Sequence, residues 1–250
     1  QLHRAGRGDG FQARLVGLAQ RRARGPTGGA SAETPCDSRH AWLAAWSSAA
    51  HTIAASSGCS FGTVDTVDCT SNLEGREAFG LGSVCGEEGL CGVTEVPPRC
   101  QAGIPANLTF PIDPALNLMV GTLFDHLLET HIGRYQSAQL AVLQANNNGG
   151  LDGVGFGIIH CTIQEDATID ALTKTEASVA MATWFADEVG VPAIVGPAAS
   201  SDTEAVYNAV AESFGTLIIS PSATSPSLTP LDGSESTDAS PGLLWRTAPP

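Results

Sequence analysis

Hydroxyl side chains gather in two short segments of the sequence, and each segment follows an apolar run. Ser200 and Ser201 come shortly after the run VPAIVG, and Ser222 and Thr224 come directly after GTLIIS. Hydroxyl groups beside free main-chain N–H groups are suited to hold a carboxylate or an amide. Either segment alone is more typical of a helix cap or a turn than of a ligand site. Together they predict one small polar ligand held between two neighbouring strand ends.

The first of these segments also has the sequence of a helix start. Ser201 and Glu204 have the spacing of a capping box, in which each side chain bonds the main chain of the other residue. A helix start presents unpaired N–H groups and the positive end of the helix dipole, which together favour an anion. We therefore expect Ser200 and Ser201 to meet the carboxylate of a ligand.

Other reactive residues lack the context that catalysis or metal binding needs. His160 and Cys161 are adjacent on a predicted strand, so their side chains point to opposite faces and cannot act as a dyad. His126 and His131 lie with Asp125 and Glu129 in an expected loop, where a metal site is the less common alternative to solvated side chains. We expect no catalytic residue, no metal and no cofactor.

Alternating strand-like and helix-like segments, from about residue 108 onward, are expected to position the hydroxyl residues. The expected strands are 116–124, 154–163, 191–196, 215–220 and 242–247, and the expected helices are 133–150, 174–189 and 202–214. Short apolar strands separated by helices form a parallel sheet that is covered on both faces. The expected fold class is therefore α/β, a doubly wound and mostly parallel sheet. Ligands of such sheets bind beyond the carboxyl ends of the strands.

The composition excludes two classes of protein. The 250 residues carry 12 basic and 26 acidic side chains, and the resulting net charge of -14 repels the phosphates of a nucleic acid. No apolar run approaches the roughly 20 residues of a membrane-spanning helix, which excludes a polytopic membrane protein.

The start of the chain has the features of an exported protein. Residues 1–38 are expected to be a disordered or non-native leader, and 39–58 have the basic, apolar and small-residue order of an export signal. The small residues before Cys59 resemble a bacterial lipoprotein signal, which implies that Cys59 is lipidated. The alternative is a buried amphipathic helix that contains Trp42 and Trp46.

Residues 59–107 are rich in cysteine and have little periodicity, which predicts an irregular cross-linked stalk. With Cys59 assigned to a lipid, four cysteines remain to form two disulfides in any of three connectivities: Cys69, Cys85, Cys91 and Cys100. A zinc site is the competing hypothesis, but the segment has no CxxC pair and no histidine. The disulfides favour an oxidising compartment.

Three stretches of the sequence resemble a known family. They are IVGPAASSDTEAVYNAVAESFGTLIISPSATSPSLT, AVLQANNNGGLDG and LLWRTAPP, and they are similar to the first lobe of type I periplasmic binding proteins. The most similar group is the leucine/isoleucine/valine-binding and amide-binding receptors of ABC transporters. The resemblance covers about 116–250 and makes 108–250 the first lobe, with the second lobe absent after Pro250.

The resemblance also implies which residues hold the ligand. Ser200 matches the serine that binds the ligand carboxylate, and Ser222 and Thr224 fall in the second ligand loop. In that loop the main chain at Ala223 meets an ammonium group and the threonine hydroxyl holds the same head group. Some relatives have a cysteine bridge near Cys161, but the partner position here is Ala199, which implies that Cys161 is unpaired.

The function that the resemblance implies is binding without catalysis. The protein is expected to be an exported solute-binding protein, periplasmic or on the outer surface and anchored by lipid, that captures an amino acid or amide. Its expected partners are that small molecule and an ABC transporter permease. The alternative is the extracellular ligand-sensing domain of a larger receptor.

Overall fold

The computed structural model describes residues 68–232, 237 and 242–250. The expected leader, export signal and lipidated Cys59 lie outside these residues. The described chain forms a six-stranded sheet in the order β3-β5-β4-β6-β7-β8 and a separate two-stranded sheet, β1-β2. Within the described part of the chain, no helix has the length and apolar character that crossing a membrane requires.

Five strands of the main sheet are parallel, as expected from the sequence. They are β4 (Asn117–Phe124), β5 (Gly155–Thr162), β6 (Ala193–Val195), β7 (Leu217–Ser220) and β8 (Leu244–Arg246). Residues 121–124 of β4 and 157–162 of β5 are buried without alternation, which is typical of strands covered on both faces. The α/β fold class predicted from the sequence is confirmed.

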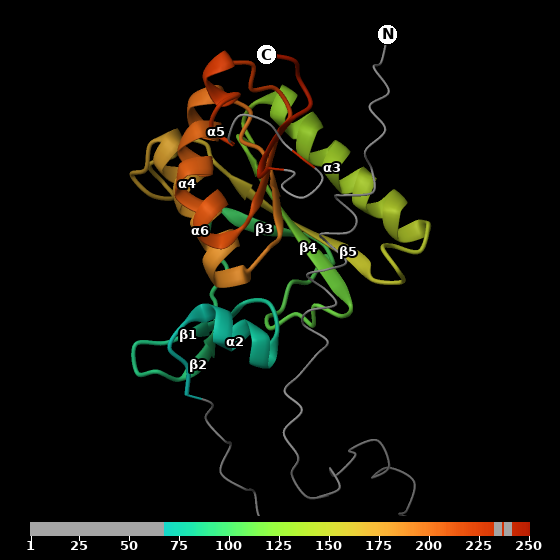
Figure 1. The fold of residues 1–250 in the computed structure, drawn as a ribbon, viewed down its shortest axis with the longest axis vertical. Coiled ribbons are helices and arrows are strands. Elements are labelled where there is room, and N and C mark those ends of the chain that lie inside the picture. The colour runs from blue at the N-terminus through green and yellow to red at the C-terminus, as the bar shows by residue number, and fades with distance from the viewer. Residues whose placement is uncertain (1–67, 233–236, 238–241) are drawn as a thin grey trace, which may run out of the picture.

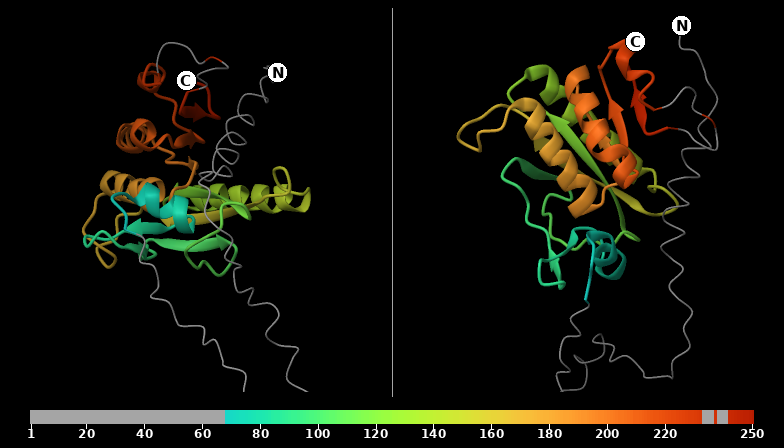
Figure 2. Two further views of the ribbon diagram at one scale, coloured as in Figure 1. Left: turned by 60° about the horizontal axis from the view of Figure 1, so that its bottom comes forward. Right: turned by 60° about the vertical axis from the view of Figure 1, so that its left-hand side comes forward.

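Helices cover both faces of this sheet. The helix after β4 is α3 (Glu129–Asn147), and it contacts β5 and β4. The other helical segments follow β5 and β6: α4 (Lys174–Thr183), η1 (Trp184–Val189), α5 (Ser200–Val206), η2 (Tyr207–Ala211) and α6 (Glu212–Phe214). In Figure 1, α3 lies on the opposite side of the strands from α4, α5 and α6, and the right-hand view of Figure 2 looks onto the latter group.

The helix α3 differs from its prediction in its boundaries, and two of its leucines are exposed. It begins at Glu129, four residues before the expected start, and its buried residues are His131 and Val142. Leu140 and Leu143, although apolar, are 55% and 46% exposed. The face that meets the strands therefore contains His131 and Val142 instead of these two leucines.

The cysteine-rich segment is more regular than the sequence suggests. It contains α2 (Asn72–Phe79), the hairpin of β1 (Ser83–Cys85) and β2 (Cys91–Val93), and β3 (Cys100–Ile104). The strand β3 pairs antiparallel with β5 at the edge of the main sheet. The segment therefore contributes a strand to the main sheet.

The disulfides differ from the expected set. Cys69 is bonded to Cys85, and Cys100 is bonded to Cys161. Cys91 is the reduced cysteine of the described chain. The prediction that Cys91 is bridged and Cys161 unpaired was therefore wrong, because β3 lies next to β5 and brings Cys100 opposite Cys161.

The hairpin and α2 pack at the end of the sheet where the strands begin. Trp184 of η1 donates its Nε1–H to Thr94 Oγ1 at 2.9 Å, and the main-chain N–H of Gly82 donates to the carbonyl of Val189 at 3.0 Å. Since η1 leads into the start of β6, these contacts place the hairpin away from the carboxyl ends of the strands. Figure 1 shows α2, β1 and β2 below the main sheet.

Candidate functional site

The strand order reverses at β4, and this creates the usual ligand position of an open parallel sheet. The chain leaves β4 toward β5 on one side and returns across β4 to form β6 on the other. The connections after β4 and β6 therefore run to opposite faces, and a crevice forms between neighbouring strand ends. The loop after β6 is one of the two hydroxyl-bearing segments identified in the sequence, and the loop after β7 is the other.

Gly196 brings the loop after β6 against the end of β4. Its φ angle of 106° lies in the region that favours glycine, and a Cβ atom at this position would lie 2.3 Å from the carbonyl oxygen of Leu123. A side chain here would force β4 and the loop apart. Because Gly196 has no side chain, the loop after β6 can pack directly against the end of β4.

The two hydroxyl-bearing loops are joined by hydrogen bonds. Ser222 Oγ donates to the carbonyl of Ala198 at 3.0 Å, and the N–H of Ser225 donates to Ser200 Oγ at 3.2 Å. Ser220 Oγ, at the end of β7, donates to the carbonyl of Pro197 at 2.7 Å. These three bonds hold the loops as one polar unit beyond the ends of β6 and β7.

The residues predicted to bind a ligand occupy different positions in this unit. Ser200 and Ser222 are half-buried and take part in the bonds between the loops, and Ala223 is buried and donates its N–H to Ser220 Oγ at 3.2 Å. Ser201 and Thr224 are exposed. The arrangement brings the five predicted residues to one edge of the sheet and leaves two hydroxyls facing outward.

The predicted capping box at Ser201 does not form. Helix α5 begins at Ser200, and its N-cap is Ala199, which has no side-chain oxygen to accept a bond. Thr203 Oγ1 donates to the carbonyl of Ala199 at 2.8 Å instead. A capping box does occur at the start of α4, between Thr173 and Glu176, a pair that the sequence analysis did not identify.

A buried carboxylate lies at the start of α5 and restricts how an anion can be bound there. Asp202 is 3% exposed and its Oδ1 accepts the hydroxyl hydrogen of Thr175 at 2.7 Å. A negative group in the first turn already interacts with the helix dipole. A ligand carboxylate at this edge would therefore depend on the hydroxyls and N–H groups of Ser200 and Ser201 rather than on a free positive helix end.

The loop after β4 contributes the charged groups at the switch point. Asp125 Oδ2 lies 3.5 Å from Lys174 Nζ, and Asp125 Oδ1 accepts the N–H of Leu127 at 2.9 Å. His131 Nδ1 accepts the N–H of Asp125 at 3.2 Å. The described residues contain no group of three or more metal-binding side chains. The acidic and histidine residues of this loop instead order one another and the start of α4.

Burial lowers the pKa of His126 in this loop and of His131 in the first turn of α3. For His126, desolvation lowers the pKa and the neighbouring Asp125 carboxylate partly opposes it. For His131, desolvation is again the main cause, and the positive charges of Arg134 and Lys174 lower the pKa further, whereas Asp125 raises it. Both imidazoles are therefore neutral near pH 7.

One part of the site was not identified from the sequence, although its strand was expected. Arg246, at the end of β8, donates from Nη1 to the carbonyl of Ser225 at 3.0 Å and from Nη2 to Thr229 Oγ1 at 2.8 Å. Thr247 Oγ1 donates to the carbonyl of Pro221 at 3.0 Å. A single arginine after an apolar strand gives no signal of these long-range contacts. Its role is to fix the loop after β7.

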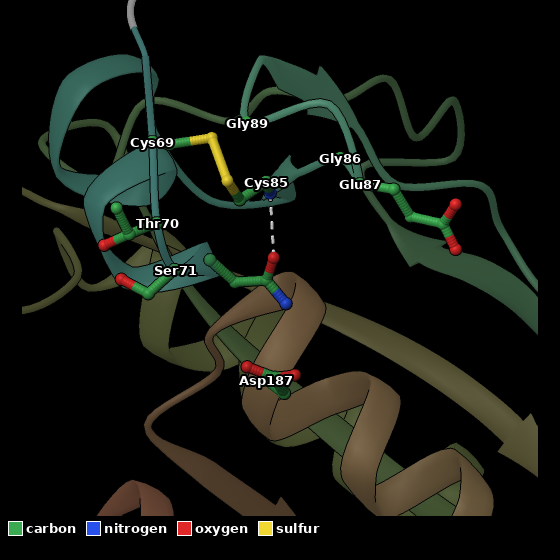
Figure 3. Close-up of a pocket in the computed structure, with 9 residues that line it drawn as sticks. Cys69, Thr70, Ser71, Cys85, Gly86, Glu87, Gly89 and Asp187 are labelled. Carbon is green, nitrogen blue, oxygen red and sulfur yellow. Dashed lines mark hydrogen bonds between the residues drawn. A yellow bond between two sulfur atoms is a disulfide. The ribbon is translucent and has the colours of Figure 1, made fainter.

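A polar cavity lies between the cysteine-rich segment and η1, far from the switch point in the fold. It has a volume of about 540 Å³, and its lining residues are Cys69, Thr70, Ser71, Asn72, Cys85, Gly86, Glu87, Gly89 and Asp187. Figure 3 shows the Cys69–Cys85 disulfide on its wall, with Glu87 and Asp187 on other sides. No residue predicted to bind a ligand lines this cavity.

Comparisons with known proteins find structural similarity but no sequence family. No family model and no curated protein matches the chain. The branched-chain amino acid substrate-binding protein LivJ from Streptococcus pneumoniae, solved with isoleucine, is 27% identical over 52% of this chain, with a TM-score of 0.42. An ABC transporter substrate-binding protein from Desulfitobacterium hafniense, solved with Leu, is 22% identical over 53% of this chain, with a TM-score of 0.41.

A putative branched-chain amino acid ABC transporter protein from Rhodospirillum rubrum is 20% identical over 53% of this chain, with a TM-score of 0.42. The chain spans only 33% to 34% of the length of these three proteins.

Proposed function

We propose that this protein is an extracytoplasmic solute-binding protein that captures a small amino-acid-like or amide ligand for an ABC transporter. In this proposal the sheet and its helices, 108–250, are the first of two lobes, and the ligand is bound without catalysis. The second lobe closes over the ligand by a hinge motion, which buries far more of a small molecule than one wall can.

The observation that carries this proposal is the joining of the two hydroxyl-bearing loops. Ser222 Oγ bonds the carbonyl of Ala198, and Ser200 Oγ accepts the N–H of Ser225, so both loops are held in place before any ligand arrives. A site ordered in advance loses less conformational entropy on binding. The arrangement lies at the carboxyl ends of β6 and β7, where ligands of open parallel sheets bind.

The exposed groups of this unit suit the head group of an amino acid. Ser201 and Thr224 are exposed and take no part in the bonds that hold the loops, so their hydroxyls can meet a carboxylate. The main-chain carbonyl of Ala223 is the expected acceptor for an ammonium or amide N–H. Ser200 and Ser222 keep the loops together and complete the polar wall around the head group.

The proposed location is outside the cytoplasm. Two disulfides in the described chain, Cys69–Cys85 and Cys100–Cys161, are typical of an oxidising compartment. We propose that Cys59, which lies outside the described residues, carries the lipid anchor that follows removal of an export signal. A permease that receives the ligand at the membrane surface is the corresponding protein partner.

A second candidate is the ligand-sensing domain of a larger receptor. The same lobe serves both functions, and the loops after β6 and β7 do not distinguish them. The sequence that follows Pro250 in the gene does: a second lobe and then a stop codon favour transport, whereas a second lobe followed by a membrane helix favours sensing.

A thermal-shift screen tests the proposed function. The protein is produced both as these 250 residues and together with the sequence that follows Pro250 in its gene, and amino acids, amides, short peptides and sugars are added. A ligand that binds only the native state raises the melting temperature. A selective rise with an amino acid or amide in the longer chain supports the proposal. A rise only with sugars, or with no compound, contradicts it.

A further inference from the structure

One cysteine of the cysteine-rich segment pairs with two others, by a disulfide and by strand register. Cys85 of β1 is bonded to Cys69, while Cys91 of β2 is a reduced, half-buried thiol. In the antiparallel pairing of β1 and β2, Cys91 lies directly opposite Cys85. A thiol therefore faces one sulfur of an existing disulfide across a two-stranded sheet.

The hydrogen bonds of the hairpin show which kind of cross-strand pair this is. Gly86 donates its N–H to the carbonyl of Leu90 at 2.9 Å, and Thr94 donates to the carbonyl of Gly82 at 2.8 Å. Because hydrogen-bonded pairs alternate along an antiparallel ladder, Cys85 and Cys91 form a non-hydrogen-bonded pair. Such pairs have Cα atoms about 4.5 Å apart and side chains on the same face. That separation is within the range of disulfides.

The protein already contains a disulfide in the same arrangement. Cys100 of β3 lies opposite Cys161 of β5 in an antiparallel pair, and the two are bonded. The adjacent bond from the N–H of Thr162 to the carbonyl of Arg99, at 2.8 Å, shows that this is also a non-hydrogen-bonded pair. A Cys85–Cys91 bridge would repeat this geometry in the hairpin.

The Cys69–Cys85 bond is also bordered by a cavity. Both cysteines line the polar cavity of about 540 Å³, together with Thr70 and Ser71 at the start of α2, and Figure 3 shows the disulfide on the cavity wall. The space beside the bond gives the leaving sulfur room to separate. Cys85 and Cys91 are both half-buried, so neither is sealed in the core.

We propose that Cys91 is the resolving thiol of an internal disulfide exchange, which converts the Cys69–Cys85 bridge into a Cys85–Cys91 bridge. The Cys91 thiol loses its proton and the thiolate attacks Cys85 Sγ. The Cys85–Cys91 bond forms as the Cys69–Cys85 bond breaks, and Cys69 leaves as a thiolate that takes up one proton. No oxidant or reductant is consumed, because one disulfide and one thiol are present before and after.

The exchange changes what the disulfide holds together. The Cys69–Cys85 bond, with a sequence separation of 16, ties the chain before α2 to the hairpin. The Cys85–Cys91 bond closes the hairpin alone. After exchange, the hydrogen bond from the N–H of Cys69 to the carbonyl of Gly89, at 2.8 Å, still joins Cys69 to the hairpin. The exchange therefore removes the disulfide cross-link between Cys69 and the hairpin, and leaves the chain before α2 joined to the hairpin only through α2 and that hydrogen bond.

The variant Cys69→Ser tests whether the second bridge can form. The full chain is oxidised with a glutathione redox buffer, its free thiols are alkylated in acid, and its disulfides are mapped by mass spectrometry of proteolytic peptides. We expect a Cys85–Cys91 linkage beside the unchanged Cys100–Cys161 linkage. If Cys85 and Cys91 are both alkylated while Cys100–Cys161 is bonded, the proposal is overturned. A linkage of either residue to Cys36, Cys59 or a second chain overturns it as well.

A control variant tests whether the Cys85–Cys91 bridge depends on the strand register or only on the presence of a nearby thiol in β2. In the triple variant Cys69→Ser/Cys91→Ser/Gly92→Cys, the new thiol is one residue further along β2 and points to the other face of the hairpin. A Cβ atom at Gly92 meets no other atom within 4 Å, so this substitution is accommodated. We expect Cys85 to stay reduced in this variant. A bridge from Cys85 to the thiol introduced by Gly92→Cys, formed as readily as Cys85–Cys91, would contradict the argument from register.

The unmodified protein shows whether the exchange occurs spontaneously. Incubation at alkaline pH without added reductant favours thiolates, which are the attacking species. We expect alkylation to appear at Cys69 and to fall at Cys91 by the same amount, while Cys91→Ser gives no alkylation at Cys69. Alkylation confined to Cys91 after prolonged incubation would overturn the proposed exchange.

Discussion

Cys100 on β3 is bonded to Cys161 on β5, and the two lie opposite each other in the antiparallel pairing of these strands. The bond fastens the cysteine-rich segment to the edge of the main sheet. It joins residues that are 61 positions apart, so it restricts the unfolded chain over a long loop. Beside it, Arg99 donates to the carbonyl of Gln164 at 2.8 Å and is paired with Asp170.

Replacing both cysteines of this bridge should destabilise the protein substantially. For the variant Cys100→Ala/Cys161→Ala, the loss of loop constraint predicts a fall of about 4 kcal/mol in the free energy of unfolding. Urea denaturation followed by circular dichroism, without reductant, measures it. As a control, Cys91→Ala removes a thiol that holds no bridge and should change stability by less than about 1 kcal/mol. Equal effects of the two variants would contradict the pairing.

All five parallel strands were predicted from their apolar runs, and all but the edge strand β8 are largely buried. The segments around β4, β5 and β6 were located to within two residues at either end, because only a buried strand accommodates such a run. The edge strand β3 was missed. Its sequence, CQAGI, neither alternates nor forms an apolar run, and its place in the sheet depends on its partner strand β5 and on the bond to Cys161.

The location of the candidate site was predictable, but its internal bonds were not. The hydroxyl residues after two neighbouring strands pointed to one edge of the sheet, and the structure places them there. Whether a hydroxyl is already engaged in a hydrogen bond depends on contacts between the two loops. The bonds from Ser222 to Ala198 and from Ser225 to Ser200 join residues that are 24 and 25 positions apart. The failed capping box at Ser201 has the same cause, since the fold starts α5 at Ser200.

A side chain at Gly196 should disturb both stability and the candidate site. In Gly196→Ala the added Cβ would lie 2.3 Å from the carbonyl of Leu123, at a φ angle of 106° that non-glycine residues rarely adopt. We expect a loss of about 2 kcal/mol or more in the free energy of unfolding. Urea denaturation measures it. In the control Gly215→Ala, φ is also positive, at 66°, but no atom lies within 4 Å, so about 1 kcal/mol is expected.

Acid should destabilise the protein through its buried histidines before its carboxylates are protonated. Desolvation, with a smaller contribution from His126, lowers the pKa of His160 to about 4. Its Nδ1 lies 2.7 Å from Thr122 Oγ1, and its Nε2 is buried against Gly103 without a hydrogen-bond partner. The unfolded chain binds a proton below about pH 6.5, whereas the native state does so only near pH 4. Stability is therefore complete above about pH 6.5 and is lost as the pH falls from there toward 4.

The full effect of His160 is on the order of 3 kcal/mol. Urea denaturation at a series of pH values between about 7 and 5 measures how the free energy of unfolding changes with pH. Carboxylates with a lowered pKa, such as Asp170, contribute little in this window, because their stabilisation is lost only at lower pH. The variant His160→Phe keeps a ring at this position and should flatten the slope, leaving the smaller contributions of His126 and His131. An unchanged slope in this variant would contradict the assignment.

Removing the exposed hydroxyl of Thr224 should weaken ligand binding without weakening the fold. Thr224→Val preserves the shape of the side chain, and the native hydroxyl is exposed rather than part of the bonds between the loops. A hydrogen bond to a charged ligand group contributes about 1.5–3 kcal/mol, which corresponds to roughly a ten- to hundredfold loss of affinity. Isothermal titration calorimetry, with an amino acid or amide identified in the thermal-shift screen, measures it on the longer chain. Ser227→Ala, at an exposed position of the same loop outside the proposed site, serves as the control and should leave affinity within about twofold. An unchanged affinity in Thr224→Val, with the melting temperature also unchanged, would remove Thr224 from the site and leave the hydroxyls of Ser200, Ser201 and Ser222 as the remaining candidates.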